Sequence, residues 1–550
     1  MSNKEIAKVF QFLGDIMELH GENPFKIRSY QNAYLTLRKL ERPLTEMESA
    51  EISAIKGVGT AIAEKIRELL DTGKMNTLQQ YLDKTPEGVQ EMLHIKGFGP
   101  KKIKVIWAEL GIETIGELLY AVNENRLLEL KGFGEKTQNE LRQQLQYFLK
   151  TRHQFHFATL EKEGLQILEG LQQALPGVKM EFTGAFRRCA NVLESIDVLL
   201  GTKAELGDVL VKIGLQNVQS QADHSSALST NEYPVRIFQC AATEFGSKQF
   251  KYSAAPNFMQ AFLEKYPDQD FRDLADETEI FAKVNQTFLP AELREEAWGL
   301  SREIPTLVEV ADIKGVVHTH STYSDGINTL REMAECSKQQ GYEYLVMSDH
   351  SKSAFYANGM QPERVLSQMA EIDALNQELA PFRIFKGIES DILNDGSLDY
   401  PEAILSKFEV IIASVHSNLR MDEVKATQRI IKAVENPYTR ILGHPTGRLL
   451  LSRQGYPLDH QKVINACAAN GVAIELNASP YRLDLDWTWI PYALDKGVLI
   501  SINPDAHSRQ GIHDIHYGVL SARKGALSAA QCLNAKGVND FVMWINSHVR

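Results

Sequence analysis

The sequence predicts a multidomain chain that begins with an all-α repeat array and ends with an α/β barrel of parallel strands. Three observations support this prediction. A length of 550 residues corresponds to three to five domains at roughly 100–200 residues each. A short glycine pattern occurs three times before residue 150, and seven short apolar runs alternate with helical segments after residue 305. Repeated helical units stack into arrays, whereas strand–helix alternation produces parallel sheets.

The composition is that of a globular protein, with 43% hydrophobic and 24% charged residues. These values exclude a wholly disordered, collagenous or membrane-embedded chain. No apolar run approaches the roughly 18 residues of a membrane span, and the N-terminal region lacks the pattern of a signal peptide. Five cysteines without CxxC spacing predict neither a disulfide framework nor a cysteine zinc site. We therefore expect a cytoplasmic, nucleoid-associated protein with no membrane partner.

The charge distribution differs between the two ends of the chain. The formal net charge is -12, which argues against nucleic-acid binding through global positive charge. Residues 1–150 contain 21 Lys and Arg against 21 Asp and Glu, so the acidic excess lies in the remaining 400 residues. Local patches of the first region could still bind DNA, and metal-binding carboxylates would add to the acidity of the second.

The repeated pattern occurs at 55–59, 95–99 and 130–134, as an apolar residue, a lysine and a Gly-x-Gly step. Each copy follows an apolar helical run and opens another, which predicts a helix, a tight hairpin and a second helix. One copy alone is better explained as a helix C-cap, but three copies favour binding of phosphates by backbone N–H groups. The pattern resembles the helix-hairpin-helix motif of DNA repair proteins. The glycines that would contact DNA without sequence preference are Gly57, Gly59, Gly97, Gly99, Gly132 and Gly134.

Residues 151–300 resemble the palm of family X DNA polymerases, an α+β nucleotidyltransferase-like fold. The resemblance rests on 183–189, which matches the turn before a metal-binding strand, and on 195–200, which matches that strand. Ser195 and Arg236 stand where two metal-binding aspartates belong, and Cys189 replaces a glycine, so only Asp197 is left. Because two-metal nucleotidyl transfer needs several carboxylates, we expect a degenerate palm without polymerase activity.

Residues 305–550 contain the strongest chemical signal. Apolar runs at 315–317, 344–347, 384–388, 410–413, 440–443, 472–476 and 498–502 predict strands, and helical patterns such as 364–378 and 460–469 lie between them. Metal-ligand residues follow almost every run, and six of the chain's 15 histidines are among them. Parallel barrel strands bring their C-terminal ends to one rim, so these side chains should meet there. The nine candidate ligands are His318, His320, Asp325, His350, Glu389, His416, His444, Asp505 and His507.

Imidazole and carboxylate ligands without thiolate suit zinc or manganese, with iron as an alternative. Nine ligands exceed the needs of one ion and imply two or three divalent cations, which suits hydrolysis of a phosphate ester by metal-bound hydroxide. The segment closely resembles the polymerase-and-histidinol-phosphatase (PHP) domain, a distorted seven-stranded (β/α)7 barrel with a trinuclear site. The resemblance implies one metal on His318, His320, Glu389 and Asp505, a second shared by Glu389 with His416 and His444, and a third on Asp325, His350 and His507.

The order of hairpin array, palm and PHP domain resembles the bacterial PolX proteins along essentially the whole chain. This resemblance implies a DNA-repair 3′-5′ exonuclease and 3′-end phosphoesterase that acts on gapped, nicked or 3′-ended duplex DNA. The 57–66 segment is also similar to the lyase segment of family X repair polymerases, in which the lysine matching Lys65 forms a Schiff base. Amine attack needs a lowered pKa, which the sequence does not reveal, so a solvated helix lysine is the alternative.

Four residues of two later loops are candidates for contacts with DNA. Arg448 and Arg453 follow His444 and could bind a phosphate bidentately, whereas Tyr481 and Arg482 could stack on a terminal base. Solvated loop side chains are the alternative in both cases.

Three other functions compete with the nuclease. A small-molecule phosphomonoesterase has no use for three hairpins, a DNA-binding scaffold does not explain nine ligands, and a gap-filling polymerase conflicts with the altered palm. The metal identity and the oligomeric state are left open.

Overall fold

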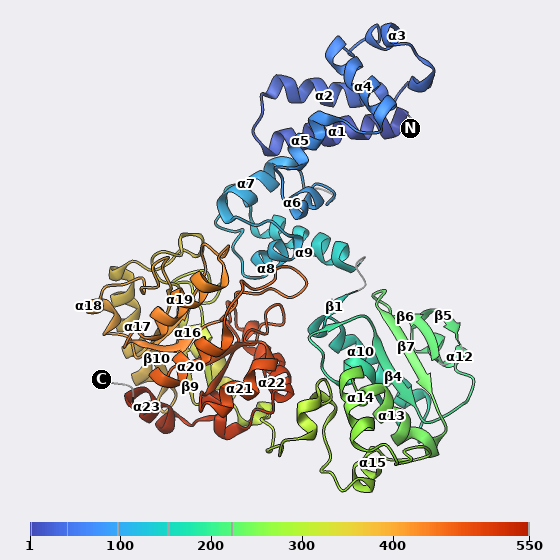
Figure 1. The fold of residues 1–550 in the computed structure, drawn as a ribbon. Coiled ribbons are helices and arrows are strands. Elements are labelled where there is room, and N and C mark those ends of the chain that lie inside the picture. The colour runs from blue at the N-terminus through green and yellow to red at the C-terminus, as the bar shows by residue number, and fades with distance from the viewer. Residues whose placement is uncertain (2, 41, 96–97, 151–153, 222–223, 548–550) are drawn as a thin grey trace. The chain divides into compact units, whose positions relative to one another are not determined.

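The computed structural model describes residues 1, 3–40, 42–95, 98–150, 154–221 and 224–547. It divides into two compact units, Met1–Phe148 and Leu149–Arg550, whose elements are labelled in Figure 1. Within the described ranges, no helix combines the length and the apolar character needed to cross a membrane.

Helices make up all the regular structure described in the first unit. They are α1 (Asn3–Leu19), α2 (Pro24–Leu37), η1 (Leu44–Glu46), α3 (Ser49–Ser53), α4 (Thr60–Thr72), α5 (Asn76–Leu82), α6 (Glu87–Met92), α7 (Pro100–Leu110), α8 (Ile115–Asn123) and α9 (Glu135–Lys150). A core of buried side chains such as Phe10, Leu13 and Ile66 holds the first of these helices together. The all-α prediction for this region is confirmed.

The three glycine patterns form hairpins that are anchored by their central residue. Val58, Phe98 and Phe133 are each buried, so the side chain between the two glycines fixes the hairpin in its local core. Gly59 and Gly99 directly precede α4 and α7, whose first backbone N–H groups have no partner within the helix. Gly134 likewise precedes α9.

The first and third hairpins share one backbone feature but differ in the segment that precedes them. Gly57 and Gly132 both have φ of 90°, a backbone conformation that favours glycine. The run before the third hairpin is a series of turns over 124–130 instead of the expected helix, because α8 ends at Asn123 and Asn125 takes a positive φ of 59°. Gly97 lies outside the described residues.

The palm region in the second unit is built on a five-stranded sheet. Its order is β2 (Met180–Phe182), β4 (Ile196–Leu200), β7 (Pro234–Gln239), β6 (His224–Leu228) and β5 (Gln216–Ser220), with β4 and β7 parallel and the other pairs antiparallel. A separate two-stranded antiparallel ribbon is formed by β1 (Phe155–His156) and β3 (Val192–Leu193). The helices are α10 (Phe157–Ala174), α11 (Gly184–Arg187), α12 (Gly207–Lys212), α13 (Phe245–Ser253), α14 (Pro256–Lys265) and α15 (Glu277–Lys283). This is the predicted α+β fold (Figure 1).

All seven apolar runs of the C-terminal region are strands of one parallel sheet. In sheet order they are β8 (Gly315–Thr319), β9 (Tyr344–Met347), β10 (Arg383–Asp391), β11 (Val410–Ser414), β12 (Thr439–Leu442), β13 (Ala473–Asn477) and β14 (Ile500–Asn503). The helices around them are α16 (Leu330–Gln339), α17 (Pro362–Leu379), α18 (Glu402–Leu405), α19 (Glu423–Val434), α20 (His460–Asn470), α21 (Ile490–Asp495), α22 (Ile515–Lys524) and α23 (Val538–Asn546). Because both faces of the sheet are covered, its strands are almost continuously apolar.

The first and last strands nearly close the barrel. At the C-terminal rim, the His320 N–H donates to the Ala506 carbonyl at 2.9 Å, and Thr319 and Ala506 form a parallel bridge. Lower down, the buried Asn534 amide donates to the Ile502 carbonyl at 2.9 Å and to the Gly315 carbonyl at 3.3 Å. The Asn534 side chain therefore bonds to backbone carbonyls of both β14 and β8, at a level where no direct hydrogen-bond ladder is described between the two strands. The predicted seven-stranded barrel is confirmed.

Candidate metal centre

The barrel rim brings all nine candidate ligands into one buried cluster. Three groups have ligand atoms within 4.8 Å of one another: His320, Asp325, His350 and His507; His318, His320 and Asp505; and His350, Glu389 and His416. His444 joins them, with its Nε2 3.0 Å from Glu389 Oε1. The residues come from the ends of six strands, β8 to β12 and β14, or from the loops that follow them. Their roles as individual metal ligands stay a prediction.

Glu389 lies at the centre of the cluster. Its Oε1 is 3.2 Å from His318 Nε2 and 3.1 Å from His416 Nε2, and its Oε2 is 2.9 Å from His350 Nδ1. Asp505 Oδ1 is 3.0 Å from His320 Nε2, and on another side Asp325 Oδ1 is 3.3 Å from His507 Nε2. The three carboxylates are thus distributed among the histidines, which is the arrangement that several adjacent cations require.

The electrostatics of the cluster reflect burial and mutual attraction. Burial opposes the charged form of Glu389, but the surrounding histidines His416, His318 and His350 hold its pKa well below the usual value. Burial also opposes a charged His416, but Glu389 and Asp391 raise its pKa to about 9. His320 behaves in the opposite way, because burial and the neighbouring histidines lower its pKa to about 3.

Several buried polar atoms of the candidate ligands make no hydrogen bond of suitable geometry within the described part of the chain, although some of them lie close to one another. They are Nε2 of His318, Nδ1 of His320, Oδ2 of Asp325, both ring nitrogens of His350, Oε2 of Glu389 and Nδ1 of His444. Orphaned polar atoms are costly in a protein interior, and a bound cation would satisfy them. The donor set, imidazole and carboxylate without thiolate, therefore fits divalent metal ions.

Two acidic residues that the sequence reasoning did not identify support the histidines. Asp391 Oδ1 is 2.6 Å from His416 Nδ1, and Glu475 Oε2 is 2.6 Å from His318 Nδ1. A carboxylate on one ring nitrogen fixes the orientation of the imidazole and leaves the other nitrogen for a metal. Asp391 could have been found, since it lies two residues after Glu389 and hence on the same face of β10.

The backbone at the rim is strained at three of the candidate ligands. His318, His444 and Asp505 have φ of 66°, 20° and 53°, a region that non-glycine residues rarely occupy. Such conformations concentrate at functional sites, where the surrounding packing maintains them.

Comparisons with known proteins agree with this architecture. The family model described as "Helix-hairpin-helix domain" matches residues 1–75, and that of the "SAM-like Helix-hairpin-helix tandem" matches residues 89–146. A protein of Bacillus subtilis (strain 168), "DNA polymerase/3'-5' exonuclease PolX", is 32% identical over 98% of both chains. The chain belongs to the PolX family. Probable phosphatases of Thermoanaerobacter sp. (strain X514) and Thermoanaerobacter pseudethanolicus are each 31% identical over 34% of this chain and 77% of their own length.

In this member of the PolX family, Asp197, the one carboxylate that the sequence predicts to be left of a palm metal site, is held in an ion pair. Arg236 Nε and Nη2 donate to Asp197 Oδ1 and Oδ2 at 2.8 and 2.6 Å, and the Ser195 hydroxyl donates to Asp197 Oδ1 at 2.7 Å. The register of β4 and β7 places Asp197 directly beside Arg236. The single remaining carboxylate is therefore already neutralised by a bidentate guanidinium. Cys189, which the resemblance predicts to stand in place of a glycine, adopts a positive φ of 51°.

The four loop candidates lie in different environments. Arg482 is buried with its Nε 3.9 Å from Asp505 Oδ2, so its charge reaches the cluster. Arg448 instead pairs with Asp486 and donates to backbone carbonyls at 482 and 483. Arg453 donates to the Gly447 carbonyl at 2.9 Å. A phosphate would have to compete with these contacts, and roles in substrate binding stay predictions.

The fourth candidate, Tyr481, packs against the palm. Its ring lies 4.9 Å from the ring of His156, edge to face, and His156 Nε2 is 3.1 Å from the Leu450 carbonyl. The Leu450 N–H in turn donates to the Tyr481 carbonyl at 2.7 Å. One palm histidine thus contacts both loops that carry the candidate residues.

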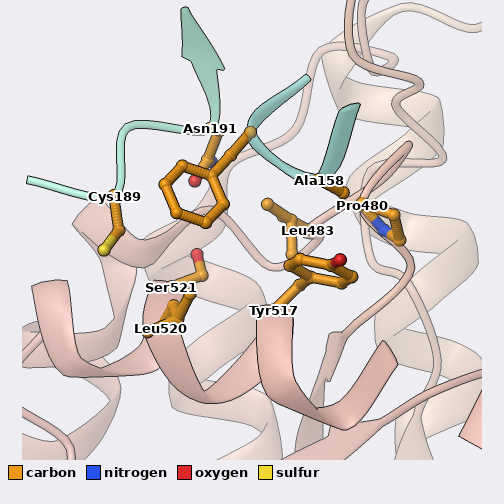
Figure 2. Close-up of a pocket in the computed structure, with 9 residues that line it drawn as sticks. Ala158, Cys189, Asn191, Pro480, Leu483, Tyr517, Leu520 and Ser521 are labelled. Atoms are coloured by element: carbon orange, nitrogen blue, oxygen red, sulfur yellow. The ribbon is translucent and has the colours of Figure 1, made fainter. Parts of the chain in front are cut away.

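Helix α22 of the barrel makes complementary charge contacts with the palm region. On α22, His516, Arg523 and Lys524 approach Glu161, Glu292 and Glu295, respectively, at 2.6–2.7 Å. A small pocket beside these pairs is lined from both sides, and Figure 2 shows Cys189 and Asn191 facing Tyr517, Leu520 and Ser521. The palm and barrel therefore form one packed body, in which the palm supports the barrel loops.

Lys65 lies on α4, in the first unit. Its Nζ donates to the Thr77 hydroxyl at 2.8 Å. This contact restrains the amine but does not test the lyase prediction.

Proposed function

We propose that this chain is a metal-dependent DNA 3′-5′ exonuclease and 3′-end phosphoesterase that acts through the barrel cluster. The observation that carries the proposal is the cluster of nine imidazole and carboxylate side chains centred on Glu389, several of whose buried polar atoms make no hydrogen bond within the described residues. The name of the Bacillus subtilis relative, which covers almost the whole chain, supports the same activity.

The nine residues would hold two or three divalent ions, either manganese or zinc, with iron as an alternative. His318, His320 and Asp505 would hold one ion, His416 and His444 a second that shares Glu389 with the first, and Asp325, His350 and His507 a third. Divalent ions in such a site supply Lewis-acid charge to a phosphodiester and acidify a water molecule. Asp391 and Glu475 keep the imidazoles of His416 and His318 oriented, and Arg482 adds positive charge where the phosphate would lie.

The hairpins would hold the duplex through its backbone. The glycines before α4, α7 and α9 carry no side chain that would cover the N-termini of these helices, so a phosphate could approach their first backbone N–H groups without any base being read. The substrate would be gapped, nicked or simply 3′-ended duplex DNA of any sequence. The Arg236–Asp197 pair supports the further proposal that the palm does not polymerise.

DNA affinity is expected to fall with salt. The logarithm of the binding constant should fall with the logarithm of the salt concentration, with a slope of about −0.9 for each phosphate neutralised. If the three hairpins neutralise about three phosphates, the binding constant should fall roughly 40-fold between 50 and 200 mM salt. Fluorescence anisotropy of the full-length His318→Ala variant on unrelated duplexes measures this, since that variant should bind DNA without degrading it. Affinity that is insensitive to salt, or restricted to one sequence, would contradict the proposal.

A 5′-labelled primer–template tests the nuclease proposal directly. With manganese, the purified protein should shorten the labelled strand from its 3′ end, and EDTA should stop the reaction. The probable phosphatases among the relatives favour one alternative, a small-molecule phosphomonoesterase. Rapid hydrolysis of p-nitrophenyl phosphate together with an intact primer would establish that alternative and reject the nuclease.

A further inference from the structure

An aromatic side chain in the loop that follows the candidate ligand His350 is exposed to an unusual degree. Phe355 is 84% exposed, more than any other large hydrophobic side chain among the described residues. It belongs to a short 3-10 turn, η6 (Phe355–Ala357), in the loop 351–360 that follows the candidate ligand His350. A single exposed phenylalanine is common on protein surfaces, but this one lies only five residues after a candidate ligand, and its apolar area would be buried by a bound substrate.

The next residue shows how close this turn lies to the cluster. The Tyr356 ring is 6.2 Å from the ring of His350 and 6.4 Å from that of His416, nearly edge to face with both. Tyr356 therefore contacts the edge of the cluster. Phe355 is the residue before Tyr356, and consecutive Cα atoms are about 3.8 Å apart. The backbone of Phe355 therefore lies close to this contact.

The loop is held rigidly by the scaffold of the metal centre. The Ser353 hydroxyl donates to Asp391 Oδ2 at 2.7 Å, and Asp391 is the carboxylate that orients His416. The Met360 N–H donates to the His350 carbonyl at 2.9 Å, which closes the loop at its base. The position of Phe355 is thus coupled to two candidate ligands.

The far side of the loop is fixed as well. Arg364 Nη1 donates to the Asn358 carbonyl at 3.1 Å and to its side-chain oxygen at 3.0 Å. Ala354 and Ala357, which flank the exposed ring on both sides, are fully buried. A rigid backbone that presents one apolar ring to solvent is preorganised for binding, because little conformational entropy is lost when a ligand covers the ring.

We propose that Phe355 is a stacking platform for a nucleobase at or next to the 3′ end of the DNA strand. This inference rests on the proposed nuclease function and assigns it a base-binding residue. Every nucleobase has a π-face, so stacking on phenylalanine suits a substrate of any sequence. The occupant is a base because the phosphodiester to be cleaved must enter the adjacent cluster, which brings the neighbouring bases to its edge. Tyr481, the aromatic residue that the sequence suggested for this role, already packs against His156.

The test compares Phe355→Ala, Phe355→Trp and a matched control on DNA with and without particular bases. Val424→Ala is the control, since Val424 is also exposed, at 64%, and lies on α19 of the same barrel. The substrates are 5′-labelled duplexes that carry either normal nucleotides or a tetrahydrofuran abasic residue at the terminal or penultimate 3′ position. Metal content is measured for every variant.

With normal ends, Phe355→Ala should lower kcat/KM about tenfold, which corresponds to the loss of one base–aromatic stack. Phe355→Trp and Val424→Ala should stay near the wild-type value. One of the two abasic substrates should be cleaved more slowly by the wild-type enzyme, because it lacks the base that stacks on Phe355. On that substrate, Phe355→Ala should lower kcat/KM no further. Such non-additivity identifies the stacked base, and a merely structural role would not produce it.

Two results would overturn the stacking proposal alone: an equal loss on every substrate, or full activity of Phe355→Ala. A change of oligomeric state in an otherwise active Phe355→Ala variant would assign the ring to a protein contact instead. Failure of the wild-type protein to shorten any of the duplexes would reject the proposed function itself, and the stacking proposal with it.

Discussion

Glu389→Ala is expected to lose divalent metal and 3′-end hydrolysis together. The Glu389 carboxylate approaches four histidines of the cluster within 3.2 Å, so its removal takes away a shared ligand and leaves buried imidazoles without their counter-charge. Activity should fall by at least about a thousandfold, since removing a single transition-state donor already costs about 10²–10³. Degradation of a 5′-labelled primer and metal analysis of the dialysed protein measure the two effects.

Asp391→Asn provides a graded comparison for this variant. Asp391 contacts His416 without belonging to the candidate ligand set, so we expect a milder loss of about 10–100-fold, as is typical of residues that orient a metal ligand. Val424→Ala should behave as wild type. Hydrolysis by pure Glu389→Ala at a near wild-type rate would show that the reaction does not depend on this cluster.

Templated primer extension is expected to be undetectable. Ser195 and Arg236 are predicted from the sequence to stand in place of two metal-binding carboxylates, and the Arg236 guanidinium binds both oxygens of Asp197 and would repel a cation. The measurement requires the His318→Ala background with manganese or magnesium and all four nucleotides, so that degradation does not conceal synthesis. Extension in this background would show that carboxylates elsewhere have replaced the missing pair.

Introducing aspartates at 195 and 236 distinguishes a palm that lacks only its metal ligands from a palm that has also lost its nucleotide-binding pocket. The double substitution Ser195→Asp and Arg236→Asp should recover little synthesis, because neighbouring residues of the palm are already engaged in other contacts. Gly184 has a positive φ, and a Cβ there would lie 2.6 Å from Asp197 Oδ2, so the turn packs directly on the remaining carboxylate. Arg187 is paired with Glu181 and Glu277 and is not free to bind a triphosphate. Strong recovery would mean that the nucleotide pocket is intact.

The sequence predicted the barrel and its cluster well because both depend on local patterns. Short apolar runs such as 344–347 and 410–413 can be recognised as buried strands from their own residues and their flanking helices. Parallel strands necessarily bring their C-terminal ends to one rim, so ligand-type residues that follow each run could be expected to meet. The three hairpins were recognisable for a similar reason, since each motif has its own glycines and buried central residue.

Only the tertiary structure showed which carboxylates orient the histidines of the cluster and which barrel loops the palm contacts. The pairing of His318 with Glu475 joins positions 157 residues apart, and that of His156 with Leu450 joins positions 294 apart. The sequence also left Arg448 available for a phosphate, whereas the fold pairs it with Asp486. Periodicity along the chain reports which face of an element is buried, but not which distant side chain lies opposite. That partner is fixed only when the barrel closes and the palm packs against α22, because hydrogen bonds and ion pairs require specific atoms within about 3 Å.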